Sequence, residues 1–476
     1  MSWVITVPFG KELDGEKAVK IRKSIRWNTL RITALGFLSV IFLGGVLLYL
    51  PVSNTKPIAF IDAMFTSVTS VCVTGLVTIT PAAQFTLFGK VVLLLLIQIG
   101  GLGVIACAAL FFFLLQKRLE LRERILLKEA YGARTLGGTV GLVKKVLAGT
   151  LIVEAFGAAL YAVQFVPEYG LIRGLWYSVF HSVSAFCNAG IDILGDSSLT
   201  DYAVNPMINL TTILLIIVSG IGFTVWFDVV ENIKKMILGE IPCKWWFRRL
   251  RLHSKLAILT TLLLIAGGTV FIFAAEWKNP ATIGRMDTGQ KLLASLFQSV
   301  TTRTAGFCTF SQSAMHEETK LFCAILMFIG GSPGGTAGGV KTTTFAMLFL
   351  VCLTFVRGGN DTECLGRRIS VANFRTGFCV VMVALAVFVS GVIAILVIEP
   401  DSAAMIDVLY ETASAVGTVG LTAELTPKLC RASQVVLMVL MYMGRLGPLT
   451  LVLTFAGKSH PRDGVRSLPK EQIMVG

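Results

Sequence analysis

Residues 65–76 read FTSVTSVCVTGL, and three later stretches repeat this pattern: FHSVSAFCNAGI at 180–191, FQSVTTRTAGFC at 297–308 and YETASAVGTVGL at 410–421. Each stretch begins with an aromatic residue, continues with small or polar residues and reaches a glycine near its end. The four glycines, Gly75, Gly190, Gly306 and Gly420, recur every 114 to 116 residues. Near-constant spacing of a matching motif indicates an internal fourfold repeat rather than four unrelated turns.

The rest of the chain has the composition of a polytopic membrane protein. Of its 476 residues, 54% are hydrophobic and 15% charged, with a mean hydropathy of +0.76, whereas a soluble protein carries about 25% charged residues. A bilayer-spanning helix needs roughly 20 apolar residues. Eight full-length spans are expected at 32–55, 91–116, 146–167, 202–227, 256–275, 321–340, 376–398 and 432–457. Each motif lies between two of these spans and is expected to enter the membrane and return, as a re-entrant pore loop.

The basic residues set the orientation. Thirty of the 42 Lys and Arg fall in five segments that lie on one side if there are eight spans and four re-entrant loops. Basic loops face the cytoplasm, so both termini are expected there. This distribution accounts for the net charge of +14 without nucleic acid. The ten cysteines are scattered without a CxxC pair, which gives a zinc or iron–sulfur site little support.

These observations predict an all-α polytopic membrane protein with four tandem membrane–pore-helix–membrane repeats around a pseudo-fourfold pore. The predicted boundaries are a cytosolic tail at 1–28, repeats at 29–125, 126–240, 241–360 and 361–457, and a cytosolic tail at 458–476. Such an arrangement is that of a cation pore. Backbone carbonyls can replace an ion's hydration shell, glycine permits the backbone conformation, and the C-terminal end of a half helix attracts cations. Acidic residues near the loops either concentrate cations at the mouth or are ordinary residues of solvated loops: Asp62, Asp192, Asp196, Asp201, Asp287, Asp407, Glu411 and Glu424.

The second span of the third repeat is unusual because residues 330–342 read GGSPGGTAGGVKT. At about 1 kcal/mol per glycine and 3 for proline, a helix is expected to break here. A nucleotide-binding loop is the rival interpretation, but GxxxxGK[ST] counted from Gly334 places Val340 where lysine is required. A second unusual feature is Arg445, a charge about halfway along the last span. Such a charge usually faces a cavity or partner, although a snorkelling or paired structural arginine is the alternative.

At these motifs the sequence resembles the Trk/Ktr/HKT superfamily of potassium transporters, over nearly the whole chain. The resemblance rests on the four loop motifs, the glycine run at 330–342 and GRLGP at 444–448. Only one span and one half helix precede Gly75, which resembles the shorter Ktr-type (KtrB-like) membrane subunit. In this superfamily a serine at the first filter glycine goes with sodium permeability, so Gly75 implies potassium.

The resemblance also implies site residues, with K⁺ bound at the filter and no other metal. The implied K⁺ filter comprises Val71, Cys72, Val73, Thr74, Gly75, Phe186, Cys187, Asn188, Ala189, Gly190, Thr302, Arg303, Thr304, Ala305, Gly306, Val416, Gly417, Thr418, Val419 and Gly420. The implied intramembrane gate beneath it comprises Gly330, Gly331, Gly334, Gly335, Thr336, Gly338, Gly339, Lys341 and Arg445.

The expected function is that of the ion-translocating subunit of a potassium uptake system, with passive or ion-coupled flow and an open question of Na⁺ dependence. The resemblance implies a homodimer in a bacterial inner or plasma membrane, no cofactor in this chain, and a cytosolic ring of nucleotide-binding RCK (KTN) subunits. The basic segment 234–255 is a candidate docking site for that ring.

Two other classes of function are alternatives to potassium uptake. A secondary carrier for another cation or a small organic solute could use broken helices, but inverted or paired repeats are expected there rather than four parallel units. A membrane enzyme has little support, because the four histidines, at 181, 253, 316 and 460, are far apart in the sequence.

Overall fold

The computed structural model describes residues 29–103, 107, 139–195, 197–240, 242–359, 361–400 and 403–447. Both predicted tails lie outside the described residues, as do the basic residues between 117 and 128, most of 104–116, Asp196, and residues 448–457 of the last predicted span.

Four long helices form the outer frame of the protein: α1 (Thr29–Tyr49), α7 (Thr139–Tyr169), α12 (Leu252–Ala275) and α16 (Val371–Ile398). They correspond to the first predicted span of each repeat. In the described part of the chain these four are long and apolar enough to cross a membrane, or five if one bent helix pair counts as a span. The chain is therefore a mostly helical membrane protein, as predicted, whereas the count of eight full spans is not confirmed.

The helices that follow the loops are short: α4 (Leu87–Leu102), α9 (Pro206–Ile221), α14 (Glu317–Phe328) and α18 (Arg431–Leu446). The prediction of one continuous span at 202–227 is wrong. Helix α9 stops at Gly222, and α10 (Phe223–Ile237) leaves it at an angle of 98°. Gly222 has φ +98°, a conformation that side-chain-bearing residues rarely adopt. The break predicted within 321–340 is present, since α14 ends at Phe328 and the next helix, α15 (Thr342–Val356), begins 14 positions later.

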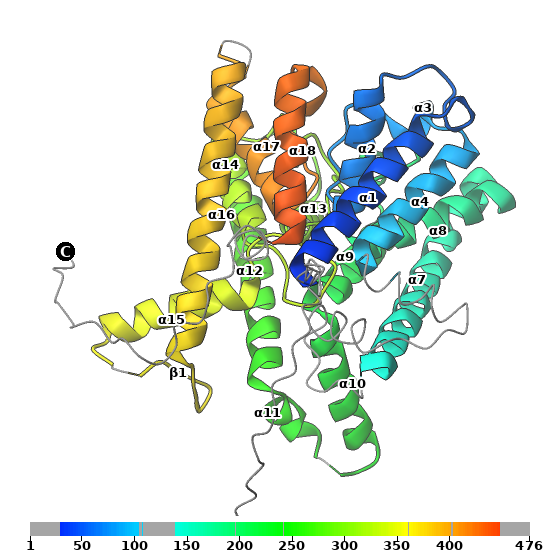
Figure 1. Cartoon of the computed structure of the whole chain (residues 1–476). Helices are drawn as coiled ribbons and strands as arrows, with labels where there is room; N and C mark the ends of the chain where they lie inside the picture. Colours follow the sequence, from blue (N-terminus) through cyan, green and yellow to red (C-terminus); the bar gives the residue numbers. More distant parts are fainter. Residues whose placement is uncertain are drawn as a thin grey trace, which may run out of the picture.

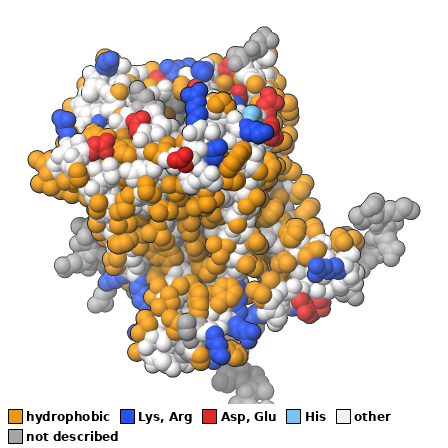
Figure 2. Space-filling model, turned by 180° about the vertical axis from the view of Figure 1, so that it is seen from behind, with side chains coloured by type: hydrophobic (Ala, Val, Ile, Leu, Met, Phe, Trp, Pro, Cys, Tyr) orange, Lys and Arg blue, Asp and Glu red, His pale blue; other side chains and the backbone are white. Residues whose placement is uncertain are grey.

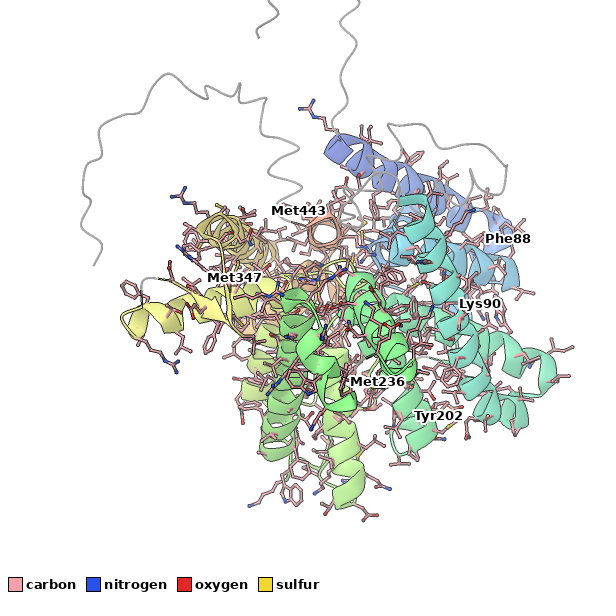
Figure 3. The ribbon with its side chains drawn as sticks, turned by 90° about the horizontal axis from the view of Figure 1, so that it is seen from below. Phe88, Lys90, Tyr202, Met236, Met347 and Met443 are labelled. Carbon is pink, nitrogen blue, oxygen red and sulfur yellow. The ribbon has the colours of Figure 1, made fainter. Side chains whose placement is uncertain are left out.

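Four shorter helices end in the glycine motifs: α2 (Phe60–Cys72), α8 (Leu171–Cys187), α13 (Thr288–Thr301) and α17 (Met405–Gly417). Figure 3, which looks along the bundle, shows the helices arranged around a common centre. In each repeat a hydroxyl residue of the motif lies against a glycine of the preceding long helix: Ser67 on Gly44, Ser182 on Gly157, Ser299 on Gly268 and Thr412 on Gly391. A leucine of the following short helix lies against the same glycine; in repeat order these are Leu96, Leu215, Leu326 and Leu440. Small residues permit such close helix packing within a membrane.

The remaining elements lie at the ends of the helices. They include α3 (Pro81–Gln84), α11 (Trp246–Arg249) and the two-residue strands β1 (Glu363–Cys364) and β2 (Arg367–Arg368), which pair antiparallel. Helix α15 extends sideways from the body near the end at which α10 and α11 lie (Figure 1). Figure 2 shows a broad hydrophobic band, with Lys and Arg gathered below it at that same end. This band is the surface expected to face lipid.

Candidate functional site

The four motif glycines meet in one closed ring. A Cβ added to any of them would collide with the carbonyl oxygen of the residue before the next motif glycine along the chain. The contacts are Gly75 with Ala189 O at 2.6 Å, Gly190 with Ala305 O at 2.6 Å, Gly306 with Val419 O at 2.5 Å, and Gly420 with Thr74 O. The fourth contact returns to the first motif, so four segments far apart in sequence share one centre. All four glycines have positive φ, between +62° and +102°, and side chains rarely adopt this conformation.

The half helices end in the same way in three of the four repeats. Val73, Asn188 and Thr418 adopt left-handed backbone conformations with φ of 55°, 60° and 51°. In each case the next residue donates its N–H across the turn: Thr74 to Thr69 O, Ala189 to Ser184 O and Val419 to Ser414 O, all at 2.8 Å. Such terminal bonds satisfy carbonyls that the end of a helix leaves unpaired.

The third repeat reaches the ring by a different backbone route. Nine positions separate its leading aromatic residue from Gly306, whereas ten separate them in the other repeats. Thr302 caps α13 in a right-handed helical conformation, and the positive φ moves to Thr304, at 77°. Ala305 N donates to Thr301 O at 3.0 Å, one residue nearer than in the other turns.

Sequence reasoning missed one set of supporting residues, the hydroxyl four positions after each leading aromatic residue. Thr69 Oγ1 accepts from Gly75 N and Ser414 Oγ accepts from Gly420 N, each at 2.9 Å. In the other repeats the hydroxyl donates beyond the glycine, from Ser184 to Ile191 O at 2.7 Å and from Thr301 to Phe307 O at 2.6 Å. The common spacing from the aromatic residue could have identified these four side chains.

All twenty predicted filter residues are buried and lie at the ends of the half helices or in the segments that follow them. The structure therefore brings the four predicted groups together around the ring. Whether they hold an ion remains a prediction.

Three of the predicted mouth acids form ion pairs or hydrogen bonds within the protein. Asp62 pairs with Arg431 at 2.6 Å, and Asp407 pairs with Lys320 at 2.8 Å. Glu411 is fully buried and accepts hydrogen bonds from Thr422, Ala423, Leu425 and Thr426. The two ion pairs join α2 to α18 and α14 to α17, and the Glu411 hydrogen bonds hold the segment that follows the fourth motif.

The glycine-rich segment Gly330–Gly339, here called the inner loop, lies against the ends of the half helices. Its two flanks pair as an isolated parallel bridge between Ile329 and Val340. Near its middle, Thr336 Oγ1 accepts from Asn188 Nδ2 at 3.0 Å and donates to Phe186 O at 3.3 Å. A Cβ on Gly338 would collide with Thr418 Oγ1. The loop therefore contacts the predicted filter segments of the second and fourth repeats.

The inner loop also occupies the break between α9 and α10. Phe223 N donates to Gly334 O at 3.0 Å, and Ser332 N donates to Gly220 O at 2.9 Å. A Cβ on Gly222 would lie 2.5 Å from Pro333 O. The unpredicted break thus exposes backbone groups of the second repeat that bind the loop of the third.

Three basic side chains hold the inner loop. Arg445 donates Nη1 to Thr336 O and Nη2 to Gly100 O, with a further contact of Nη2 to Gly101 O at 3.3 Å. Lys341 Nζ donates to Ala337 O at 2.6 Å. Arg303, only 7% exposed, directs Nη2 at Gly330 O over 3.4 Å. Arg445 thus bridges the loop to the end of α4, and sequence reasoning missed the contact of Arg303 with the loop.

A ring of glycine turns at the ends of four half helices is a backbone arrangement suited to ion passage. The family model for TrkH, a cation transport protein, matches residues 21–467 of this chain. The chain belongs to the TrkH family of cation transport proteins. It is therefore a membrane cation transporter and not an enzyme, as predicted.

Curated relatives of this TrkH-family chain cover nearly all of it. The Ktr system potassium uptake protein B of Bacillus subtilis is 40% identical over 92% of this chain and 95% of that protein. The potassium/sodium uptake protein NtpJ of Enterococcus hirae is 35% identical, over 96% of this chain and 99% of that one. The solved structure of the potassium transporter TrkH from Vibrio parahaemolyticus matches with a TM-score of 0.71 at 18% identity, covering 91% of this chain and 86% of that one. That likeness shows a shared fold.

Within the described ranges, no three His, Cys, Asp or Glu side chains come together as a metal site would require.

Proposed function

We propose that this protein is the ion-translocating subunit of a potassium uptake system, in which K⁺ passes through the glycine ring. The closed cycle of contacts among the four motif glycines carries the proposal. Two relatives with 35–40% identity are named as potassium uptake proteins B of Ktr systems. In this proposal the four repeats, at 29–125, 126–240, 241–360 and 361–457, are pseudo-equivalent pore units.

In the proposed filter, backbone carbonyls replace the hydration shell of K⁺. Carbonyl rings are suited to this task because they attract a cation without a fixed charge that would trap it. The hydroxyl bonds of Thr69 and Ser414 to the glycine N–H groups hold the turns in place. The buried ends of the half helices direct their negative partial charge toward the same centre.

In the proposed gate, the inner loop obstructs the pathway and Arg445 holds it there. The Arg445 guanidinium reaches Thr336 O and the end of α4 simultaneously, so moving the loop requires breaking charge-assisted hydrogen bonds. The positive charge itself opposes the approach of a cation. Opening would then release Thr336 from Asn188 and Phe186 at the predicted filter.

The proposed complex has a second copy of this chain and a cytosolic ring of RCK (KTN) subunits that bind nucleotide. The name Ktr system in several relatives supports a multi-component assembly. The Lys and Arg of α10 and α11 offer a basic surface at one end of the molecule, which we assign to the cytoplasm together with both termini. Dependence of this uptake on Na⁺ is an open part of the same proposal, and the Enterococcus relative is named for uptake of both potassium and sodium.

The test is Rb⁺ uptake into proteoliposomes that contain the purified chain, paired with growth rescue of a potassium-uptake-deficient strain at low K⁺. Uptake competed by K⁺ but not by Na⁺ is expected. Gly75→Ser should lower this preference, whereas Gly267→Ser should not, because nothing lies within 4 Å of a Cβ at Gly267. Unselective uptake by the unaltered chain, or transport of an organic solute instead, would refute the proposal and favour a secondary carrier.

A further inference from the structure

A cavity of about 500 Å³ lies among α14, α15 and α16, apart from the glycine ring. Its walls are almost entirely apolar and include Leu321, Ile325, Phe328, Phe349, Leu385 and Phe388. Ile329 and Val340, the bridged residues that flank the inner loop, also line it. The cavity therefore touches both ends of the segment that we propose as the gate.

The mouth of the cavity opens on surface that the bilayer is expected to cover. The lining residues Ile325, Phe349 and Leu385 are 54%, 61% and 42% exposed, although each side chain is large and apolar. Helix α15, with Met347, extends outward from the ring of helices (Figure 3). Apolar cavities do not hold ordered water well. Hydrocarbon from the surrounding lipid is the material available to fill this one.

Two basic residues lie on the cavity-lining helices or directly after them, toward the strand pair that connects α15 and α16. Arg357 follows α15 directly, five residues beyond the cavity-lining Cys352. Arg375 lies in α16, six residues before the cavity-lining Val381. At about 1.5 Å per helical residue, each arginine lies roughly 8–9 Å along the helix axis from that lining residue. Anionic lipid headgroups are attracted to basic residues just outside the hydrocarbon region.

We propose that this cavity binds one acyl chain of an anionic phospholipid, with the headgroup phosphate on Arg357 and Arg375. The chain then packs on Ile329 and Val340. There it supports the backbone bonds at the neck of the inner loop, from Gly330 N to Val340 O at 2.9 Å and from Val340 N to Phe328 O at 3.2 Å. A lipid site in contact with the loop neck follows from this geometry.

Charge at the cavity distinguishes this occupant from a second copy of the chain. Two arginines on the helices that line an apolar cavity match an anionic amphiphile, and in the described part of the chain neither has a carboxylate within ion-pair distance. A stable protein interface buries about 800 Å² per partner, far more surface than one acyl chain needs. A second copy is nevertheless an outcome that the experiment can reveal.

The experiment uses the purified full chain in nanodiscs that contain phosphatidylglycerol with a photoreactive diazirine in one acyl chain. Mass spectrometry of the labelled peptides should place the label on cavity-lining segments of α14, α15 and α16. Cys352→Trp and Ala324→Trp fill the cavity from different walls and should lower that label about tenfold, the loss expected if roughly two methylene groups are excluded. Ala324 is buried, so a tryptophan there could disturb folding, whereas Cys352 is exposed and should accept one. The Cys352 variant therefore tests the cavity even if the Ala324 variant does not fold. The matched control is Val397→Trp, on a 74% exposed position of α16 outside the cavity.

The headgroup contact has its own control. Replacing both Arg357 and Arg375 with Gln should reduce labelling by phosphatidylglycerol and leave labelling by the phosphatidylcholine analogue unchanged. Three results would overturn the proposal: cavity labelling no stronger than that around Val397, equal labelling by both lipids in the unaltered chain, or no label together with an inter-subunit cross-link at the cavity. The last would assign the cavity to a second copy.

Discussion

The third repeat and the other three close the same glycine ring with different backbones. Val73, Asn188 and Thr418 turn the chain in left-handed conformations, whereas the third repeat is one residue shorter and uses Thr304. The third repeat also supplies the inner loop and Arg303, which lies between that loop and the ring. The first, second and fourth repeats thus share one type of turn at the ring. The third repeat, which also carries the inner loop, has a different turn.

This difference separates two roles that sequence similarity alone combines. Side chains that contact the ring backbone should govern which ion passes, and those that contact the inner loop should govern how fast it passes. Arg303 is adjacent in sequence to ring residues but contacts the loop, so it tests whether the two roles separate.

The largest effect is expected from replacing the ring glycines. Serine at Gly75, Gly190, Gly306 or Gly420 would place a Cβ against a neighbouring carbonyl and force a side chain into a positive φ. K⁺ preference over Na⁺ should fall at least about tenfold, equivalent to 1.4 kcal/mol, as measured by competition in Rb⁺ uptake. Gly267→Ser is the control. Unchanged selectivity in all four variants, with normal membrane levels, would exclude a shared ring.

A large change in rate is expected from Arg445→Ala. The substitution removes the hydrogen bonds to Thr336 O and to Gly100 O and the positive charge beside the pathway. The maximal uptake rate should therefore rise several-fold, and ion preference should stay the same. Charge-assisted bonds contribute about 1.5–3 kcal/mol each, so Arg445→Lys, which retains the charge, should have a smaller effect.

Deleting several glycines of the inner loop should act in the same direction as Arg445→Ala, because it shortens the obstruction. Loss of selectivity in either variant would place these residues in the filter instead. Loss of transport at normal membrane levels would make them structural supports, and the proposed gate would fail.

A smaller change in rate is expected from Arg303→Gln. Its single contact with the loop is long, 3.4 Å to Gly330 O, and Gln retains polarity at a buried position. Maximal uptake should rise less than in Arg445→Ala, with K⁺ preference unchanged, if Arg303 acts through the loop. Because both side chains hold one segment, the effects of the double variant should be less than additive. A change in selectivity would return Arg303 to the filter and remove the distinction between the repeats.

Much of this architecture was predictable because it follows from the regular spacing of the motifs and the local density of glycine. Constant spacing of the motifs located the half helices and their glycines, and the density of glycine at 330–339 located the interruption after α14. The break at Gly222 was not predictable, since one glycine costs a helix only about 1 kcal/mol. Its cause is tertiary: the backbone at Gly220 and Phe223 binds the inner loop.

The pairing of charged residues was likewise not predictable from the sequence. Asp62 and its partner Arg431 are 369 positions apart, and nothing local distinguishes a paired acid from a free one. Likewise, the neighbours of Arg303 suggest a filter residue, whereas its guanidinium contacts Gly330. Residue type predicted which segments matter, and only the fold determined which side chains meet.

The smallest effects should come from the hydroxyls behind the ring, and they sharpen the comparison further. Ser414→Ala removes the acceptor of the buried Gly420 N–H, and an unsatisfied buried donor costs about 1–3 kcal/mol. Ser184→Ala removes a donor to Ile191 O, and a carbonyl that loses one bond tolerates the loss better because it has two lone pairs. We therefore expect Ser414→Ala to lower the apparent melting temperature in detergent by a few degrees, and more than Ser184→Ala does. Thr69→Val should lower the apparent melting temperature about as much as Ser414→Ala, and Thr301→Val about as much as Ser184→Ala. Fluorescence measures the thermal unfolding. An equal loss in all four variants would show that the hydroxyls support the repeats in one common way, and the third repeat would then differ from the others in its turn and its loop alone.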